Sequence, residues 1–249
     1  MTKTALITGA SGGIGRAFAV ALAREGWTIT AVARTEAKLS ALVRELGEEH
    51  DYLVADLSSS AGQDAVIARL REQRFDLLIN NAGVGTLGDF HEVPVERTLS
   101  MMHLNLDAVV RLAHAYLAGA RAGDALMNVS STLAFVPMAR SGIYCATKAF
   151  VTSFSESLWY EQKPRGVYVM GLCPGPTHSD FQTNAGGREE DLPQNMFQTA
   201  EVVVERALAA LRRRSKPTIF TASRNTLFSV FGRIVPRKVL ANVAGKMSA

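Results

Sequence analysis

The strongest constraint on this chain is the alternation of short apolar runs with longer segments of helical periodicity. Apolar runs rich in β-branched residues lie at positions 4–7, 28–33, 52–54, 77–79, 125–129, 167–172 and 217–220. The intervening segments place apolar residues at helical spacing, as in Ile14, Phe18 and Leu22. Such alternation is typical of a parallel sheet with helices on both faces. We therefore expect an α/β fold with a doubly wound parallel sheet.

The 249 residues contain no internal repeat and no low-complexity linker, which favours a single domain. We place this domain at residues 1–220, with a long helical stretch at 93–121. A polar segment at about 177–198, rich in Gly, Asn and Gln, is predicted to form a lid over the substrate. Residues 221–249 form a separate basic tail.

Cysteine content and the start of the chain bear on location. The two cysteines, Cys145 and Cys173, are too few for a disulfide framework or a metal cluster, which favours a reducing compartment. The chain enters its first apolar run at Thr4, and no apolar run approaches the roughly 18 residues that a membrane span needs. We expect a cytoplasmic protein without a leader peptide.

A glycine-rich turn, Thr8-Gly9-Ala10-Ser11-Gly12-Gly13-Ile14-Gly15, joins the first predicted strand to the first predicted helix. Glycines allow the backbone to turn tightly and to approach a pyrophosphate, while the helix N-terminus offers free N–H groups. A glycine-rich turn without a ligand is the alternative. The position of the turn after an opening strand favours dinucleotide binding and a Rossmann-type sheet.

The end of the second predicted strand bears on the choice of cofactor. An Asp or Glu about 20 residues after the glycines would bind the ribose 2′-hydroxyl of NAD. Arg34 occupies this region instead, and a guanidinium suits a 2′-phosphate. Unless Arg34 is an ordinary surface residue, we expect NADP(H), with NAD as the less favoured cofactor.

Tyr144 and Lys148 are four residues apart and would share one face of a helix. An ammonium group beside a phenol is expected to lower the tyrosine pKa from about 10 toward neutrality, giving a general acid/base. An exposed helical pair is the alternative. Ser131 follows the strand predicted at 125–129, at the sheet edge where ligands bind, and its hydroxyl could bond a substrate carbonyl.

These motifs together resemble those of the short-chain dehydrogenase/reductase family. The matches run in order from residue 4 to residue 177, and they comprise Thr8-Gly9-x-x-x-Gly13-x-Gly15, Asn80-Asn81-Ala82-Gly83, Asn105, the Ser131–Tyr144–Lys148 set, and Pro174-Gly175 with Thr177. One position departs from the pattern, because many NADP-using members carry a basic residue where this chain has Gly12. Recognition of a 2′-phosphate would therefore depend on Arg34, with Ser11, Thr35 or Lys38 assisting.

The resemblance implies a role for each matched residue. Tyr144 would exchange a proton with the carbonyl oxygen, Lys148 would lower its pKa and hold the nicotinamide ribose, and Ser131 would polarise the carbonyl. Asn105 would hold a water that links Lys148 to solvent. The implied cofactor-binding residues are Gly9, Ser11, Gly13, Ile14, Gly15, Arg34, Asp56, Leu57, Asn81, Ala82, Gly83, Tyr144, Lys148, Pro174, Gly175 and Thr177. A homodimer or homotetramer formed through the long helix and the Tyr144 helix is also implied.

Other reactive side chains are expected to be structural. The five histidines show no metal-like spacing with another His, Cys or acid, so we predict no metal. His178, in the predicted lid, could touch substrate. Cys145 and Cys173 are expected to be buried, and a thiol mechanism is disfavoured.

The tail contrasts in charge with the rest of the chain. From Arg206 onward there are ten basic residues and no acid, whereas residues 1–205 carry 17 basic and 23 acidic groups. Leu227, Phe228, Phe231, Ile234 and Val235 have the spacing of an amphipathic helix, which Pro236 would end before a second helix near Arg237. The tail could pack on the body, on a partner or over the cleft. Peripheral contact with an anionic membrane is the alternative, and nucleic acid is not expected.

The sequence therefore predicts an oxidoreductase that moves a hydride between NADP(H) and a carbonyl or secondary alcohol. Leu133, Phe135, Val136, Met138 and Phe181 suggest an apolar small-molecule substrate. Two alternatives remain at this point: a non-catalytic NADP-binding sensor or scaffold of the same fold, and an epimerase or dehydratase, which would also need the Tyr and Lys.

Overall fold

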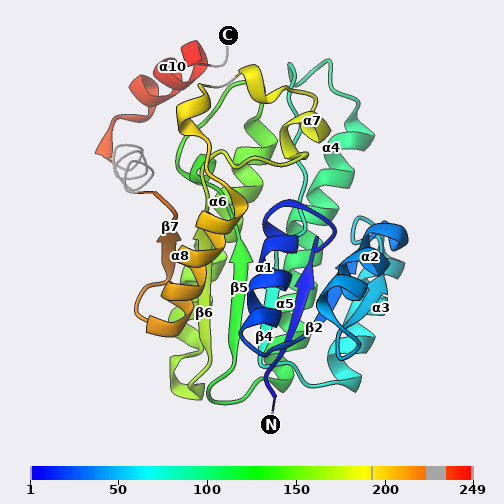
Figure 1. Ribbon diagram of the computed structural model, residues 1–249. Helices are drawn as coiled ribbons and strands as arrows, with labels where there is room; N and C mark the ends of the chain where they lie inside the picture. The colour runs from blue at the N-terminus through cyan, green and yellow to red at the C-terminus, as the bar shows by residue number, and fades with distance from the viewer. Residues whose placement is uncertain (1, 192, 223–233, 248–249) are drawn as a thin grey trace.

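A computed structural model describes residues 2–191, 193–222 and 234–247. Its centre is one seven-stranded sheet in the order β3-β2-β1-β4-β5-β6-β7, with every neighbouring pair parallel (Figure 1). The strands are β1 (Thr4–Thr8), β2 (Thr28–Ala33), β3 (Asp51–Val54), β4 (Leu77–Asn80), β5 (Ala125–Val129), β6 (Tyr168–Cys173) and β7 (Thr218–Phe220). This confirms the doubly wound, Rossmann-type sheet. Each predicted strand is present, with ends that differ by one residue at most.

Successive side chains of the strands feed two separate hydrophobic cores. Ala5 and Ile7 of β1 pack into one core, and Leu6 between them packs into the other. All three are completely buried. A strand covered on both faces needs apolar residues at consecutive positions. For this reason the strands appear in the sequence as continuous apolar runs rather than as alternating ones.

Helices cover both faces of the sheet. In Figure 1, α1 and α8 lie in front of it and α5 and α6 behind. The first core includes side chains of α1, α2 and α8, and the second includes those of α3, α5 and α6. The α-helices of this part are α1 (Gly13–Arg24), α2 (Glu36–Leu46), α3 (Ser60–Glu72), α4 (Val95–Met102), α5 (Ala108–Gly119), α6 (Gly142–Glu161) and α8 (Ala200–Arg213).

The stretch predicted to be helical at 93–121 is nearly continuous. Between α4 and α5 it passes through one π-helical turn, η1 (His103–Asp107). Short helices supply the remaining connections: η2 (Thr132–Phe135), η3 (Lys163–Arg165), α7 (Phe181–Ala185), η4 (Glu189–Asp191) and η5 (Gln194–Met196). The last three belong to the segment at 177–198. A β-bridge between Thr177 and Gln198 joins the two ends of this segment.

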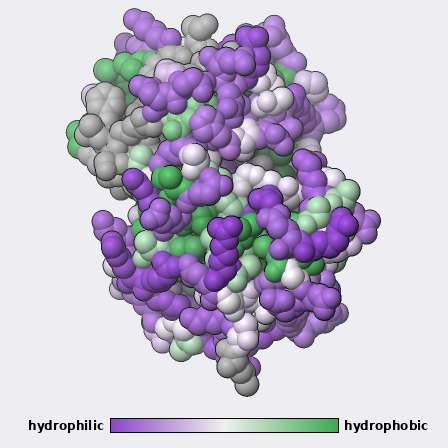
Figure 2. Space-filling model, in the orientation of Figure 1, coloured by the Kyte–Doolittle hydropathy of each residue, from purple (hydrophilic) through white to green (hydrophobic). Residues whose placement is uncertain are grey.

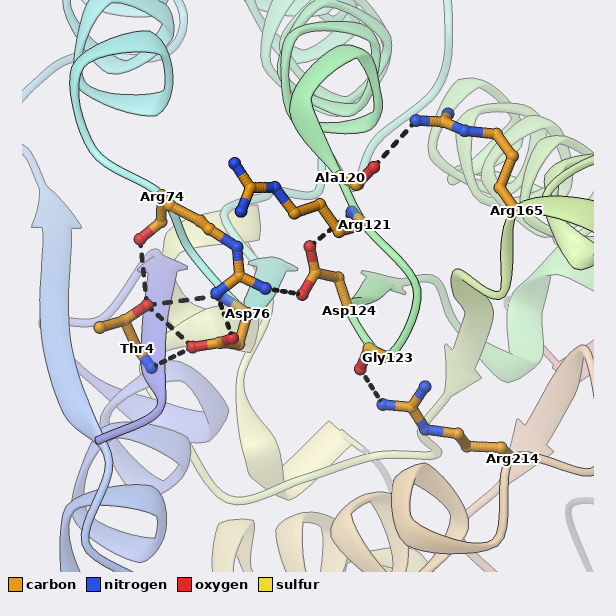
Figure 3. Close-up of polar contacts among 9 residues, drawn as sticks. All are labelled: Thr4, Arg74, Asp76, Ala120, Arg121, Gly123, Asp124, Arg165 and Arg214. Atoms are coloured by element: carbon orange, nitrogen blue, oxygen red, sulfur yellow. Dashed lines mark hydrogen bonds and ion pairs between the residues drawn. The ribbon is translucent and has the colours of Figure 1, made fainter. Parts of the chain in front are cut away.

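A polar network ties the sheet together at the amino ends of its strands (Figure 3). Asp124 is 1% exposed and accepts hydrogen bonds from the Arg74 guanidinium at 2.5 Å and the Arg121 backbone N–H at 2.7 Å. Arg74 also pairs with Asp76, which accepts a bond from the Thr4 backbone N–H at 2.8 Å. The network thus joins the starts of β1, β4 and β5, at the edge opposite their carboxyl ends.

The tail is described in part. Helix α10 (Arg237–Met247) begins at the residue near which a second tail helix is expected. The amphipathic helix predicted from Leu227, Phe228 and Phe231 lies outside the described residues. Among the helices that the structure describes, none is long and apolar enough to cross a membrane.

Candidate active site

A cavity of about 1460 Å³ runs along the carboxyl ends of the strands. It touches the ends of β1, β2, β4, β5 and β6 and is covered by the segment at 177–198. In Figure 2 this face is hollowed across its middle, where apolar residues gather between mostly hydrophilic rims. Most of the predicted site residues line it: Gly9, Ser11, Gly13, Ile14, Arg34, Asp56, Leu57, Asn81, Ala82, Gly83, Ser131, Tyr144, Lys148, Pro174, Gly175 and Thr177. Gly15 and Asn105 are the two that do not.

Two positions of the glycine turn, Gly9 and Gly15, have no room for a side chain. Gly9 has a φ of +66°, and a Cβ there would lie 2.8 Å from the Asn81 Nδ2 atom. A Cβ on Gly15 would lie 2.3 Å from the Gly9 carbonyl oxygen. Gly15 therefore allows α1 to pack against the turn instead of lining the cavity. Helix α1 begins without a side-chain cap and without an acid in its first turn. Its first N–H groups are thus available to an anion such as a pyrophosphate.

Asn81 holds the turn from the neighbouring strand. Its Nδ2 atom donates to the Thr8 carbonyl at 2.9 Å and to the Gly9 carbonyl at 3.3 Å. The Thr8 hydroxyl in turn accepts from the backbone N–H groups of Asn81 and Ala82, at 3.0 and 2.9 Å. The ends of β1 and β4 are therefore fixed to each other beside the cavity.

Arg34 lies at the end of the cavity formed by β2 and β3. Partial burial would raise the pKa of Asp56, but hydrogen bonds from Ser58 and the positive charge of Arg34 hold it below its ordinary value. Asp56 is therefore ionised beside Arg34. Thr35 and Lys38 line the same end of the cavity. Two cations and a hydroxyl at this place fit a phosphorylated ribose.

Tyr144, Lys148 and Ser131 meet at the other end of the cavity. Tyr144 and Lys148 lie on one face of α6, with the Lys148 Nζ atom 5.8 Å from the centre of the Tyr144 ring. Ser131 hydrogen-bonds the Tyr144 hydroxyl, and its own Oγ atom accepts from the Leu133 N–H at 3.1 Å. All three residues are at most 9% exposed. The structure thus brings the three predicted residues together in one part of the cavity.

The expected lowering of the Tyr144 pKa is wrong for this arrangement. Burial raises the pKa of Tyr144 well above its ordinary value, and the hydrogen bond from Ser131 offsets only part of this rise. Lys148 donates to the Val129 carbonyl at 2.9 Å and lies over the ring of Tyr144. Burial also lowers the pKa of Lys148 to about 8. For both pKa values, burial therefore has a larger effect than the proximity of the two groups. The spacing of the residues in the sequence does not show this burial.

Asn105 lies behind the cavity wall, in the π-helical turn η1. Its side chain donates to the Val84 carbonyl at 2.9 Å and to the Thr147 hydroxyl at 3.2 Å, and accepts from the Val84 N–H at 3.1 Å. A Cβ on Gly83 would lie 3.2 Å from the Asn105 Oδ1 atom and 3.3 Å from the Lys148 Nζ atom. Gly83 thus keeps open a small space that both groups face. π-Helical turns occur frequently at functional sites.

The cavity near Tyr144 is mostly apolar. Phe181 of α7 packs against Tyr144 with ring centres 5.5 Å apart, and the predicted residues Leu133 and Met138 also line this part. Phe135 and Val136 were expected there too. Both are buried outside the lining, and Phe135 packs on Phe220 at 5.4 Å.

His178, for which contact with substrate was one possibility, does not line the cavity. It stacks on Phe197 and bonds Glu189 at 3.0 Å. Other lining residues were not singled out individually from the sequence, because no motif marks them: Leu87, Arg140 and Arg188 between regular elements, and Gln182, Asn184 and Met196 in α7 and η5. In the described part of the chain, no three His, Cys, Asp or Glu residues cluster as metal ligands would.

Comparison with known proteins places these features in a family. The sequence pattern of the short chain dehydrogenase family matches residues 3–190. A short-chain dehydrogenase from Sphingobium yanoikuyae, solved in complex with NADPH, is 34% identical, with a TM-score of 0.84 over 96% of this chain and 95% of that one. The bulky-bulky ketone specific alcohol dehydrogenase from Comamonas testosteroni is 32% identical, with a TM-score of 0.79 over 93% and 92%.

Among curated proteins, the hydroxysteroid dehydrogenase-like protein 1 of Gallus gallus is 32% identical over 181 residues, 69% of this chain. The matched region spans only 55% of that relative. The serine 3-dehydrogenase of Agrobacterium fabrum is 29% identical over 79% of this chain and 81% of its own length. Fold and site define an oxidoreductase with a Rossmann-type sheet. The chain belongs to the short-chain dehydrogenase/reductase family.

Proposed function

We propose that the protein transfers a hydride between NADP(H) and a ketone or secondary alcohol, with Tyr144 as general acid/base. The observation that carries this proposal is the convergence of Ser131, Tyr144 and Lys148 in the same cavity as the glycine turn. The cavity extends from Arg34 to Tyr144 along the strand ends, as an extended dinucleotide would require. When bound, the nicotinamide supplies or accepts the hydride.

Each residue of the site has a defined task in this proposal. Ser131 orients the carbonyl, because its hydroxyl already faces that of Tyr144. The Tyr144 hydroxyl gives its proton to the carbonyl oxygen during reduction and takes it back during oxidation. Lys148 favours the phenolate that reduction leaves, because a positive charge stabilises a nearby anion. Asn105 and Gly83 border the space in which a water would link Lys148 to solvent, so that a proton from solvent replaces the one that Tyr144 gives up.

The preference for NADP(H) rests on Arg34, Thr35 and Lys38 at the far end of the cavity. The free N–H groups of α1 would hold the pyrophosphate, and the Gly9 and Gly13 backbone would allow it to approach. The structural relative from Sphingobium yanoikuyae, solved with NADPH, is consistent with this cofactor.

The decisive test is Tyr144→Phe, which removes the proton donor and keeps the ring. We expect kcat to fall at least about 10³-fold, while the affinity for NADPH, measured by fluorescence titration, stays within a factor of about two. Tyr160→Phe is the matched control, because Tyr160 lies on the same helix but is 73% exposed. Full turnover by Tyr144→Phe would refute the proposed role.

Activity measurements on the unaltered protein separate the alternatives. A sensor or scaffold would bind NADPH tightly and turn over no member of a broad ketone and alcohol panel. An epimerase or dehydratase would convert substrate without net consumption of cofactor. Retention of Ser131, Tyr144 and Lys148 in one buried site favours the oxidoreductase over the sensor.

We further propose a cytoplasmic homodimer or homotetramer acting on an apolar carbonyl compound. Leu99, Val110 and Phe150 expose apolar side chains on α4, α5 and α6, where the family resemblance implies subunit contact. The two free thiols, Cys145 and Cys173, fit a reducing compartment. Light scattering of the purified protein tests the oligomeric state.

For the tail, we propose that α10 packs on the body, with the segment at 177–198 serving as the substrate lid. The burial of Leu240 and Ala244, each at most 3% exposed, supports this. Val239 and Val243 are exposed on α10. An anionic membrane could bind them together with the basic residues of the tail. Flotation with anionic liposomes tests this second hypothesis, and absence of binding at low salt would exclude it.

A further inference from the structure

A second cavity of about 300 Å³ adjoins the candidate active site. Met138 and Arg140 line both cavities and therefore form the boundary between them. The remaining lining of the smaller cavity is largely apolar: Thr86, Gly88, Phe90, Val93, Thr98, Ala139, Gly142 and Ile143. Arg140 therefore lies where the two cavities adjoin.

Arg140 has a backbone conformation that arginine rarely adopts. Its φ is +59°, in the left-handed region that favours glycine, and only Arg214 shares this property among the described non-glycine residues. Residues in such strained conformations cluster at functional sites. An arginine is therefore held at a position where glycine would relieve the strain.

Only one of the three side-chain nitrogens of Arg140 has a partner among the described residues. Its Nε atom lies 3.5 Å from the Asp89 carboxylate, while Nη1 and Nη2 make no hydrogen bond to any described residue. Two parallel N–H donors on one guanidinium match the two oxygens of a carboxylate. The ion pair with Asp89 involves Nε, so Asp89 does not occupy this pair of donors.

Asp89 offsets part of the positive charge of Arg140, so the other charges near the cavity also bear on whether an anion can bind. The acidic residues of the main cavity are Asp56, beside Arg34, and Asp180, which pairs with Lys38 at 3.7 Å. The two carboxylates thus lie beside Arg34 and Lys38, although Asp180 is next in sequence to Phe181, which packs on Tyr144. Near Arg140, helix α6 begins without a side-chain cap and without an acid in its first turn, so its N-terminus adds a partial positive charge.

We propose that Arg140 binds a carboxylate carried by the substrate, so that the preferred substrates are keto acids with an apolar chain between the two groups. This inference rests on the proposed function and names its substrate class. The apolar chain would contact Leu133, Met138 and Phe181, while the ketone meets Ser131 and Tyr144. Association is expected to weaken with salt, because the guanidinium is about half exposed.

The test compares ω-keto carboxylates of increasing length with their methyl esters. In the unaltered protein, kcat/KM should favour the acid by about tenfold or more at the best chain length, and added salt should reduce this ratio. Arg140→Gly should lower the ratio to about one, because it removes the guanidinium that distinguishes the acid from the ester. Arg140→Lys should restore part of it.

Arg214→Gly is the matched control, since it also removes an arginine at positive φ, and Arg214 does not line the cavity. A ratio that changes less than twofold in Arg140→Gly would overturn the inference while leaving the proposed function intact. If the protein reduces no ketone, calorimetry measures the binding of hexanoate and of methyl hexanoate instead. If no ketone is reduced but hexanoate binds in an Arg140-dependent manner, the carboxylate site stands and the proposed function fails. If hexanoate binding is also independent of Arg140, both fail.

Discussion

The hydroxyl of Ser130 donates a hydrogen bond of 2.7 Å to the backbone carbonyl of Lys148. Ser130 follows β5 and Lys148 lies in α6, so this bond joins the two elements that carry the proposed catalytic set. Thr152 lies 2.7 Å from the Ser130 hydroxyl, donates to the same carbonyl at 3.0 Å, and is 3.8 Å from the Cys173 sulfur of β6. The turn of α6 that bears Lys148 is therefore anchored by buried hydroxyls.

Ser130→Ala is expected to misplace Lys148 without unfolding the protein. We expect a loss of about 1 kcal/mol of stability and a fall in kcat of about tenfold, with the pH profile of kcat displaced because the surroundings of Lys148 change. A serine with a merely structural role would leave the pH profile unchanged. Ser157→Ala is the control, since Ser157 also bonds a helix carbonyl, that of Ser153, but on the exposed side of α6.

Lys148→Met is expected to abolish turnover and yet to stabilise the protein. Burial lowers the pKa of Lys148 from 10.5 to about 8, so the folded chain holds this proton less tightly than the unfolded chain. The charged group therefore destabilises the fold below pH 8, and this cost fades as the pH rises from about 8 toward 10.5. We expect the variant to gain on the order of 1 kcal/mol at pH 7, with the gain shrinking above pH 8. Urea denaturation at several pH values measures it, and a gain that grows with pH would contradict the argument.

Arg34→Ala is expected to alter cofactor choice and little else. Loss of a charged hydrogen-bonding partner should raise the Kd for NADPH by about 10- to 100-fold and leave that for NADH nearly unchanged. The two constants are measured by fluorescence titration. Arg44→Ala, on the exposed surface of α2, should change neither. Equal losses for both cofactors would place Arg34 away from the 2′-phosphate.

Asp124→Ala is expected to affect stability and not catalysis. The carboxylate is buried between Arg74 and the Arg121 N–H (Figure 3). It lies at the amino edge of the sheet, whereas Tyr144 lines the cavity at the carboxyl ends of the strands. Its removal should cost about 2 kcal/mol, because buried donors lose their acceptor. Asp107→Ala, which breaks an exposed pair with His103, should cost less than about 0.5 kcal/mol. A large fall in kcat for Asp124→Ala at temperatures where it is folded would argue against this separation.

The sequence determined the sheet and most of the site because both depend on local patterns. Each strand is a short apolar run, and a strand buried on both faces needs such a run. The glycines, Ser131 and Tyr144 follow strand ends or share a helix face, so their convergence follows from a parallel sheet. Gly15 and Asn105 matched motifs as well, but their places behind the cavity wall depend on how α1 and η1 pack.

Features that depend on burial or on contacts between distant segments could not be predicted from the sequence. The raised Tyr144 pKa reflects the closed surroundings of the phenol, which spacing to Lys148 does not report. His178 forms a hydrogen bond with Glu189, eleven residues away in an irregular segment, and does not line the cavity. Arg140 gave no signal, because a positive φ at a non-glycine residue has no signature in composition or periodicity.

The hydrogen bonds from Asn81 to the Thr8 and Gly9 carbonyls have a thermodynamic consequence. Because side-chain amides and strand ends already fix the turn, a dinucleotide would meet a rigid receptor there, and little chain entropy would be lost on association at that end. Loss of these Asn81 hydrogen bonds would therefore reduce the affinity for the dinucleotide, because the turn of the free protein would become more flexible. The Asn81 amide nitrogen need not touch the ligand for this effect.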